Sequence, residues 1–164
     1  DEASSGTSAR LRALHMVRRL NSIRAVLLHL TLELSLYESD AKSLSLEDLA
    51  AKTQEITRRF TPNERDTHPF WWANDMYVVE YPFNGINYLY GWMIAAQIRA
   101  WWKRTNAEPI LSKAFGDFLR TTCYPLGNSI SWQQHLREIT GEDINPAYLI
   151  EELSIAKNLF DEVA

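Results

Sequence analysis

Four histidines are the residues of this sequence best suited to metal or acid–base chemistry, and two of them have a carboxylate at helical spacing. His29 and Glu33 are four residues apart and His135 and Glu138 are three apart, so each pair would share one face of a helix. Each pair could supply two ligands to a metal ion, whereas a closed zinc site needs more than two. We therefore favour packing roles for both pairs and predict no metal site in this chain.

The other signals for catalytic chemistry are weak. Cys123 is the only cysteine, which excludes an internal disulfide and a thiolate metal cage, and we expect it to be a small packing residue. The sequence has no HExxH zinc motif, no glycine-rich phosphate loop, no G-x-S-x-G element and no C-x-x-C pair. The tryptophans, including Trp92, Trp101 and Trp102, are expected to pack in the core or at a subunit contact.

The composition is that of a globular chain that can bury a core. The 164 residues are 46% hydrophobic and 12% aromatic, which is about one domain's worth. The formal net charge of −4 argues against a nucleic-acid partner, and no apolar run is long enough to predict a membrane span. Because a single cysteine suits a reducing compartment, the sequence predicts a cytoplasmic protein. The chain begins at Asp1 rather than methionine, so we expect it to be part of something larger.

The hydrophobic pattern predicts an all-α fold of five to six helices, because no segment alternates convincingly with a period of two. We expect a disordered leader over 1–8 and a single helical domain over 9–164. The first helix, predicted over 9–38, is the longest. Its apolar residues recur every three or four positions, at Ala13, Met16, Leu20, Ile23, Leu27, Leu30, Leu34 and Tyr37.

Capping and turn signals place the remaining helices. Ser45 and Asp48 form a capping box that starts a helix ending near Phe60. The aromatic segment 61–83 is predicted to be a packed loop with a short helix, and a largely buried helix follows over 85–104. A further helix is predicted over 109–122, with Pro109 in its first turn. Another starts at a Ser131–Gln134 capping box and runs to Ile139, ahead of Gly141. The last starts at Asn145–Pro146 and runs to about Val163.

Several segments resemble one family of enzymes. The run MYVVEYPFNGINYLYGWMIAAQI, within 76–99, is similar to the tyrosine-rich helix near the end of helical zinc oligopeptidases. These are the thimet oligopeptidase and oligoendopeptidase F group, with angiotensin-converting enzyme as a more distant relative. The segments 29–38, 44–60 and 126–153 resemble neighbouring parts of these enzymes in the same order, so the resemblance covers about residues 10–160.

The resemblance implies that the chain is the C-terminal portion of the catalytic domain of a zinc metallopeptidase. In that family the HExxH motif and a third zinc ligand lie N-terminal to this region, and the zinc polarises the scissile carbonyl and activates water. This chain has no HExxH segment, so the resemblance implies no cofactor in the chain itself, zinc in the complete enzyme, and no activity of the chain alone. The region would form one wall of the channel that holds the peptide substrate.

Carried over residue by residue, Tyr88 matches the family tyrosine closest to the oxyanion and is the candidate catalytic residue. The candidate substrate-binding residues are Tyr81, Tyr77 and Asn87. The alternative for Tyr88 is a structural role, as a buried tyrosine whose hydroxyl bonds to a backbone carbonyl.

Two positions depart from the family pattern. Gly85 occupies the position of a companion tyrosine, and Val78 occupies the position of a histidine. A shifted loop would be needed to bring Tyr81, Tyr77 or His68 into the pocket instead.

The sequence leaves three functions open. The first is the peptidase portion, which would have lost its zinc-bearing half. That loss would uncover part of the Leu20–Leu34 seam and the tryptophan side of the 85–104 helix, so we expect a homodimer or a complex with a complementary zinc-bearing chain. The second, favoured by Val78 and Gly85, is a non-catalytic relative that binds peptides or a partner protein. The third is a helical interaction module that self-associates through the seam over 13–37.

Overall fold

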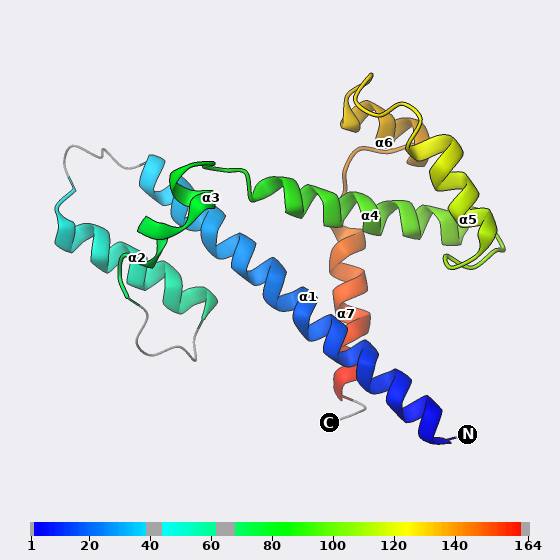
Figure 1. Cartoon of the computed structure of the whole chain (residues 1–164), viewed down its shortest axis with the longest axis horizontal. Helices are drawn as coiled ribbons and strands as arrows, with labels where there is room; N and C mark the ends of the chain where they lie inside the picture. The colour runs from blue at the N-terminus through cyan, green and yellow to red at the C-terminus, as the bar shows by residue number, and fades with distance from the viewer. Residues whose placement is uncertain (1, 39–43, 62–67, 162–164) are drawn as a thin grey trace. The chain divides into compact units, whose positions relative to one another are not determined.

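The chain is helical throughout the part described by the computed structural model (Figure 1). The described backbone covers residues 2–38, 44–61 and 68–161, and side chains are described in these ranges except for 2–10, 12, 13 and 155–161. No strand occurs in these ranges, which confirms the all-α prediction. The elements are α1 (Glu2–Tyr37), α2 (Leu46–Phe60), the 3₁₀ helix η1 (Trp71–Asn74), α3 (Met76–Val79), α4 (Ile86–Thr105), α5 (Lys113–Phe118), the π-helical turn η2 (Leu119–Cys123), α6 (Trp132–Thr140) and α7 (Ala147–Asp161).

The helices divide into two compact units, residues 1–89 and residues 90–164. The sequence predicted one helical domain over 9–164, whereas the boundary between the units falls within α4. The helix α1 begins at Glu2. The long first helix is confirmed, and it ends one residue before the predicted Glu38.

The apolar seam of α1 is only half buried. Ile23 and Leu30 of the seam are 7% and 8% exposed, and Leu32, on the opposite face of the helix, is fully buried. The row formed by Leu20, Leu27 and Leu34, spaced seven residues apart, is exposed. Successive members of such a row lie nearly above one another on a helix, so these three leucines lie on one side of α1.

Two buried threonines of α2 hold the aromatic segment that follows it. The predicted capping box starts α2, with the Asp48 amide donating to the Ser45 hydroxyl at 3.1 Å. Thr57 accepts a hydrogen bond from the indole nitrogen of Trp71 at 3.2 Å, and Thr53 accepts one from Trp72 at 3.1 Å. These bonds satisfy indole N–H groups that would otherwise be costly to bury. Residues 62–67 of the predicted aromatic segment lie outside the described residues.

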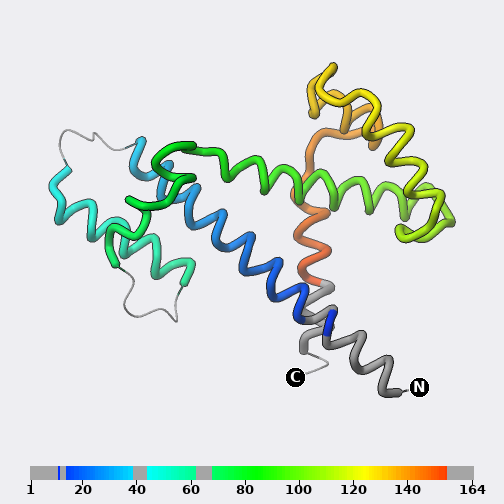
Figure 2. The backbone as a smooth tube through the Cα atoms, in the orientation of Figure 1, coloured from blue at the N-terminus to red at the C-terminus, as the bar shows by residue number. Residues whose placement is uncertain are grey.

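The loop 80–85, which connects α3 to α4, lies against α1 (Figure 2). Gly85 is buried there, and a Cβ atom at this position would sit 3.9 Å from Val26 and 4.0 Å from Leu30. The ring of Phe83 contacts that of Tyr37 at 5.1 Å between centroids. The loop therefore fixes the start of α4 on the surface of α1.

In the second unit, α5 covers the tryptophans of α4. Trp102 is 5% exposed, lies 5.1 Å from both Phe115 and Phe118, and donates its indole N–H to the carbonyl of Glu108 at 2.8 Å. Trp101 stacks on Phe118 at 5.3 Å. The expectation of an uncovered tryptophan face is therefore wrong for Trp102, because the same chain buries it.

The helix predicted over 109–122 begins later, at Lys113. The hydroxyl of Ser112 accepts from the Phe115 amide at 3.2 Å and caps α5. Pro109 instead forms a turn in which its carbonyl accepts from the Ser112 amide at 3.0 Å. The Ser112 hydroxyl accepts a hydrogen bond from an amide in the first turn of α5, whereas the side chain of Pro109 has no acceptor. The serine therefore determines where α5 begins.

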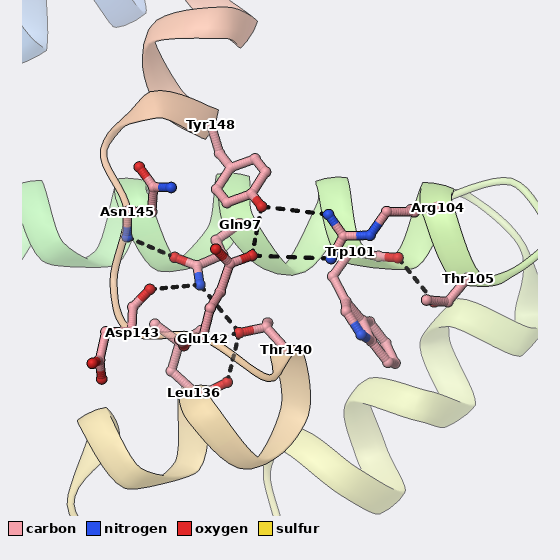
Figure 3. A network of polar contacts seen from close by, with 10 residues as sticks. All are labelled: Gln97, Trp101, Arg104, Thr105, Leu136, Thr140, Glu142, Asp143, Asn145 and Tyr148. Carbon is pink, nitrogen blue, oxygen red and sulfur yellow. Dashed lines mark hydrogen bonds and ion pairs between the residues drawn. The ribbon is translucent and has the colours of Figure 1, made fainter.

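A buried glutamine joins α4, α6 and the loop before α7 (Figure 3). Gln97 is fully buried, and its side-chain nitrogen donates to the Thr140 hydroxyl at 3.1 Å and to the Asp143 carbonyl at 3.0 Å. Its side-chain oxygen accepts from the Asn145 amide at 2.9 Å. Arg99 of α4 also pairs in a bidentate manner with Glu152 of α7, at 2.7 and 2.8 Å.

The predicted ends of α6 and α7 are confirmed in most respects. Ser131 caps α6, and Gly141 ends it in the left-handed region at a φ of 82°. The side chain of Gln134, expected to complete a capping box, bonds to Glu138 instead, at 2.9 Å. Asn145 accepts from the Ala147 amide at 2.9 Å at the start of α7. The predicted end near Val163 lies outside the described residues.

Candidate functional site

The predicted catalytic tyrosine forms a pair with one of the predicted substrate-binding tyrosines. The hydroxyl oxygens of Tyr77 and Tyr88 are 3.0 Å apart, and their rings meet edge to face at 6.0 Å. Tyr77 belongs to the short helix α3 and Tyr88 to the first turn of α4. The side chain of Tyr88 is 49% exposed, which rules out the deeply buried tyrosine that the sequence left open. The pKa of Tyr77 is raised, and the largest cause is the hydrogen bond to Tyr88.

The position of Tyr77 depends on a carboxylate at the start of α3. Asp75 is the N-cap residue, and it accepts from the Tyr77 amide at 2.8 Å. Its second oxygen lies 3.6 Å from Nε2 of His29 on α1. The imidazole of His29 in turn stacks on Trp71 at 5.1 Å. These contacts connect the tyrosine pair with the middle of α1 and with the aromatic segment after α2.

Glu33 binds the loop that connects the helices of the two tyrosines. It lies on α1, is 1% exposed, and accepts from the Phe83 amide at 3.0 Å. Burial raises the pKa of its carboxyl, the Phe83 amide partly offsets this, and the charge of Asp75 adds to the increase. The sequence analysis considered Glu33 only as a metal ligand beside His29. The structure gives the two residues different partners, Phe83 and Asp75.

The remaining predicted site residues do not join the pair. Tyr81 is 54% exposed in the loop after α3, and the side chain of Asn87 bonds to Asn84 at 2.8 Å. Val78 is 7% exposed and packs in the core, so the position of the family histidine carries no polar group here. Gly85 is buried against α1, where a Cβ atom would contact Val26 and Leu30, and it supplies no hydroxyl to the pair.

The other histidines have local partners. His68 accepts from the Phe70 amide at 3.1 Å through Nδ1. Nε2 of His135 lies 3.0 Å from the Cys123 carbonyl, while Glu138 accepts from Gln134, so His135 and Glu138 have separate partners. No group of three His, Cys, Asp or Glu side chains able to hold a metal ion occurs in the described part of the chain.

A hollow of about 350 Å³ lies between α1, α2 and Trp71. Among the described residues that line it, Arg24 is the charged one. Leu28 and Trp71 provide apolar surface, and Thr57 and Thr61 provide hydroxyls. This combination suits a small ligand, or part of a larger one, that joins an apolar group to an anionic one. The remaining lining residues are Asn21 and Ala25.

The sequence analysis missed the roles of Asp75 and of Glu33 toward Phe83. A signal for Asp75 was present, because an Asp directly before a short helix is a typical N-cap. Glu33 gave no such signal, because its partner lies 50 residues away along the chain.

Comparison with known proteins adds no identity: no family model, no curated protein and no solved structure matches this chain. Among the helices within the described ranges, none has the length and apolar character needed to cross a membrane.

Proposed function

We propose that the chain is the C-terminal portion of a zinc-dependent oligopeptidase of the thimet oligopeptidase and oligoendopeptidase F type. It forms one wall of the peptide channel and contributes Tyr88 on the oxyanion side. The zinc site belongs to an N-terminal part of the protein or to a separate chain. The observation that best supports this proposal is the Tyr77–Tyr88 hydroxyl pair, at 3.0 Å on an accessible surface.

The tyrosine pair has the chemistry that an oxyanion needs. Attack of water on a peptide carbonyl places negative charge on the carbonyl oxygen, and a preorganised O–H donor stabilises that charge. The two hydroxyls share one hydrogen bond, and an O–H of this pair is the donor that we assign to the oxyanion. When Tyr77 is the internal donor, the hydrogen bond strengthens Tyr88 as a donor, because hydrogen bonds in a chain polarise one another. In the complete enzyme, bound zinc would supply carbonyl polarisation and an activated water.

The hollow beside Trp71 is consistent with a peptide as the ligand. Arg24 suits a carboxylate, such as the C-terminus of a short peptide, and Leu28 and Trp71 suit an apolar side chain. His29 and Asp75 lie in the contacts that connect Trp71 with the tyrosine pair. We therefore place a peptide subsite in this hollow.

The proposed partner is a second copy of the chain or a complementary zinc-bearing chain. The row formed by Leu20, Leu27 and Leu34 is the surface that such a partner would cover. Full burial of one leucine stabilises by about 1.5–3 kcal/mol. The exposed row therefore represents a sizeable part of the about 5–15 kcal/mol that stabilises a typical domain.

A second candidate function is a non-catalytic relative that binds peptides or a partner protein. Val78 and Gly85 favour it, because the structure buries both positions and neither carries a polar side chain. This candidate would keep the hollow and the exposed leucine row, but Tyr88 would have no role in turnover.

Steady-state kinetics of the complete natural protein distinguish the two candidates. With quenched-fluorescence peptides, Tyr88→Phe should lower kcat by about 10²-fold, because it removes one oxyanion donor. The matched control Tyr124→Phe changes a tyrosine that is 67% exposed in the second unit, and it should leave kcat unchanged. Full activity of the Tyr88→Phe protein would contradict the role of Tyr88. Binding of the peptides without turnover would support the non-catalytic relative.

A further inference from the structure

Glu33 is the charged residue among the buried side chains of the described part of the chain. Its exposed fraction is 1%, and it follows the fully buried Leu32 on α1. A carboxylate in such a place loses the solvation of water, and it needs hydrogen bonds in return. The Phe83 amide provides one such bond at 3.0 Å, while the nearby Asp75 adds a repulsive charge. A leucine could fill the same space without these costs, so packing alone does not account for a glutamate here.

The hydrogen-bond partner of Glu33 has an unusual backbone conformation. Phe83 is the non-glycine residue with a positive φ, 62°, in the described part of the chain. A residue with a Cβ atom is strained in this region, so the surrounding contacts must hold it there. Backbone hydrogen bonds within the loop, such as that from the Asn84 amide to the Tyr81 carbonyl at 3.1 Å, shape the turn itself. The Phe83 ring against Tyr37 and the buried Gly85 are its apolar contacts with α1, and the bond to Glu33 is a hydrogen bond that ties it to that helix.

This loop determines how the two tyrosines meet. Tyr77 lies six residues before Phe83 on α3, and Tyr88 lies five residues after it on α4. The distance between their hydroxyls therefore depends on the angle that the loop sets between α3 and the start of α4. A change of φ at Phe83 would reorient the start of α4 and move the Tyr88 hydroxyl away from Tyr77.

We propose that Glu33 is the positioning residue of the tyrosine pair: by accepting from the Phe83 amide it holds the loop in its left-handed conformation and keeps the two hydroxyls in contact. The inference rests on the proposed function for what the pair does to a substrate. It does not rest on that function for the geometry, which is a property of the chain alone.

Three substitutions separate reach, charge and volume. Glu33→Gln keeps an oxygen at the same reach and removes the charge, so the pair should persist. Glu33→Asp keeps the charge but withdraws the carboxylate by about 1.5 Å, beyond hydrogen-bonding distance of the amide. Glu33→Leu keeps the volume and removes the acceptor. The pair should therefore separate in the Asp and Leu variants and remain in the Gln variant.

The readout is the ionisation of Tyr77, followed by NMR of protein carrying ¹³Cζ-labelled tyrosine. Tyr77→Phe and Tyr88→Phe assign the two resonances among the seven tyrosines. Because the hydrogen bond to Tyr88 raises the pKa of Tyr77, separation of the pair should lower that pKa toward the ordinary value of 10.0. At neutral pH, the Tyr88 resonance of the Asp and Leu variants should shift toward its position in the Tyr77→Phe protein. The resonance of Tyr124, in the second unit, serves as the internal reference for an intact fold.

The expected result is a wild-type titration of Tyr77 in Glu33→Gln and a lowered pKa in Glu33→Asp and Glu33→Leu. If Glu33→Leu does not fold, the comparison of Asp with Gln still decides. A wild-type titration in a folded Asp variant would overturn the proposal, as would a Gln variant that behaves like Asp. Loss of activity plays no part in this test. If Tyr88→Phe leaves the kcat of the complete enzyme unchanged, the proposed function alone is refuted. If Tyr77 titrates as in the wild type in a folded Glu33→Asp variant, the positioning role of Glu33 alone is refuted.

Discussion

Replacement of Gln97 by methionine should destabilise the second unit by about 3 kcal/mol. The substitution keeps the length and volume of the side chain but removes the hydrogen bonds to Thr140, Asp143 and Asn145, which measure 2.9–3.1 Å. A typical intramolecular hydrogen bond contributes about 1 kcal/mol net, and a buried group left without its partner costs more. Thr140 keeps a second partner, the Leu136 carbonyl, at 2.9 Å, which limits the loss at that residue.

Urea unfolding followed by circular dichroism measures this loss as a shift of the midpoint at constant slope. Gln134→Met is the matched control, because it makes the same substitution at an exposed position of α6 and removes a bond to Glu138 across one helical turn. Such pairs contribute about 0.2–0.5 kcal/mol. Equal losses in the two variants would show that the Gln97 network does not hold α4, α6 and the loop before α7 together.

Three further predictions concern single residues. Burial raises the pKa of Cys123 to about 11, so less thiolate is present at pH 8 than for a free cysteine. Iodoacetamide should therefore alkylate Cys123 about 10²-fold more slowly than a free cysteine. Equal alkylation rates, followed by mass spectrometry, would contradict this. Gly141→Ala, at a φ of 82°, should lower the free energy of unfolding by about 1 kcal/mol. Gly91→Ala, in open space on α4, should raise it by about 0.5–1 kcal/mol. Urea titrations that show changes of the same sign for both variants would refute the argument. Leu27→Glu should weaken self-association measured by sedimentation equilibrium, whereas Leu111→Glu, at a side chain that is 99% exposed, should not. A wild-type protein that is monomeric would contradict the predicted homodimer.

The helix boundaries that could be predicted depend on local hydrogen bonds. Ser45, Ser131 and Gly141 act on amides or carbonyls within one helical turn, so the sequence around each of them contains the whole interaction. The start of α5 could not be predicted in the same way, because Pro109 and Ser112 are competing local signals three residues apart. The capping hydroxyl of Ser112 prevailed.

The candidate site could be predicted only in part, because its geometry depends on residues far apart in sequence. The resemblance singled out Tyr88 and Tyr77, and their contact depends on a left-handed Phe83 held by Glu33 from another helix. The burial of Gln97 likewise depends on partners more than 40 residues away. Periodicity shows which face of a helix is apolar, but it cannot show which polar side chain has its partner on another helix.

Peptide hydrolysis by the complete natural protein, purified without chelator, tests the central claim most directly. Zinc is determined by elemental analysis, and quenched-fluorescence peptides are assayed before chelation, after chelation and after zinc is restored. We expect stoichiometric zinc and hydrolysis that is lost and regained with the metal. The 164-residue chain alone should contain well below one zinc per molecule and be inactive. A complete protein that binds no zinc and cleaves no peptide would contradict the proposal, as would chelator-sensitive hydrolysis by the 164-residue chain alone.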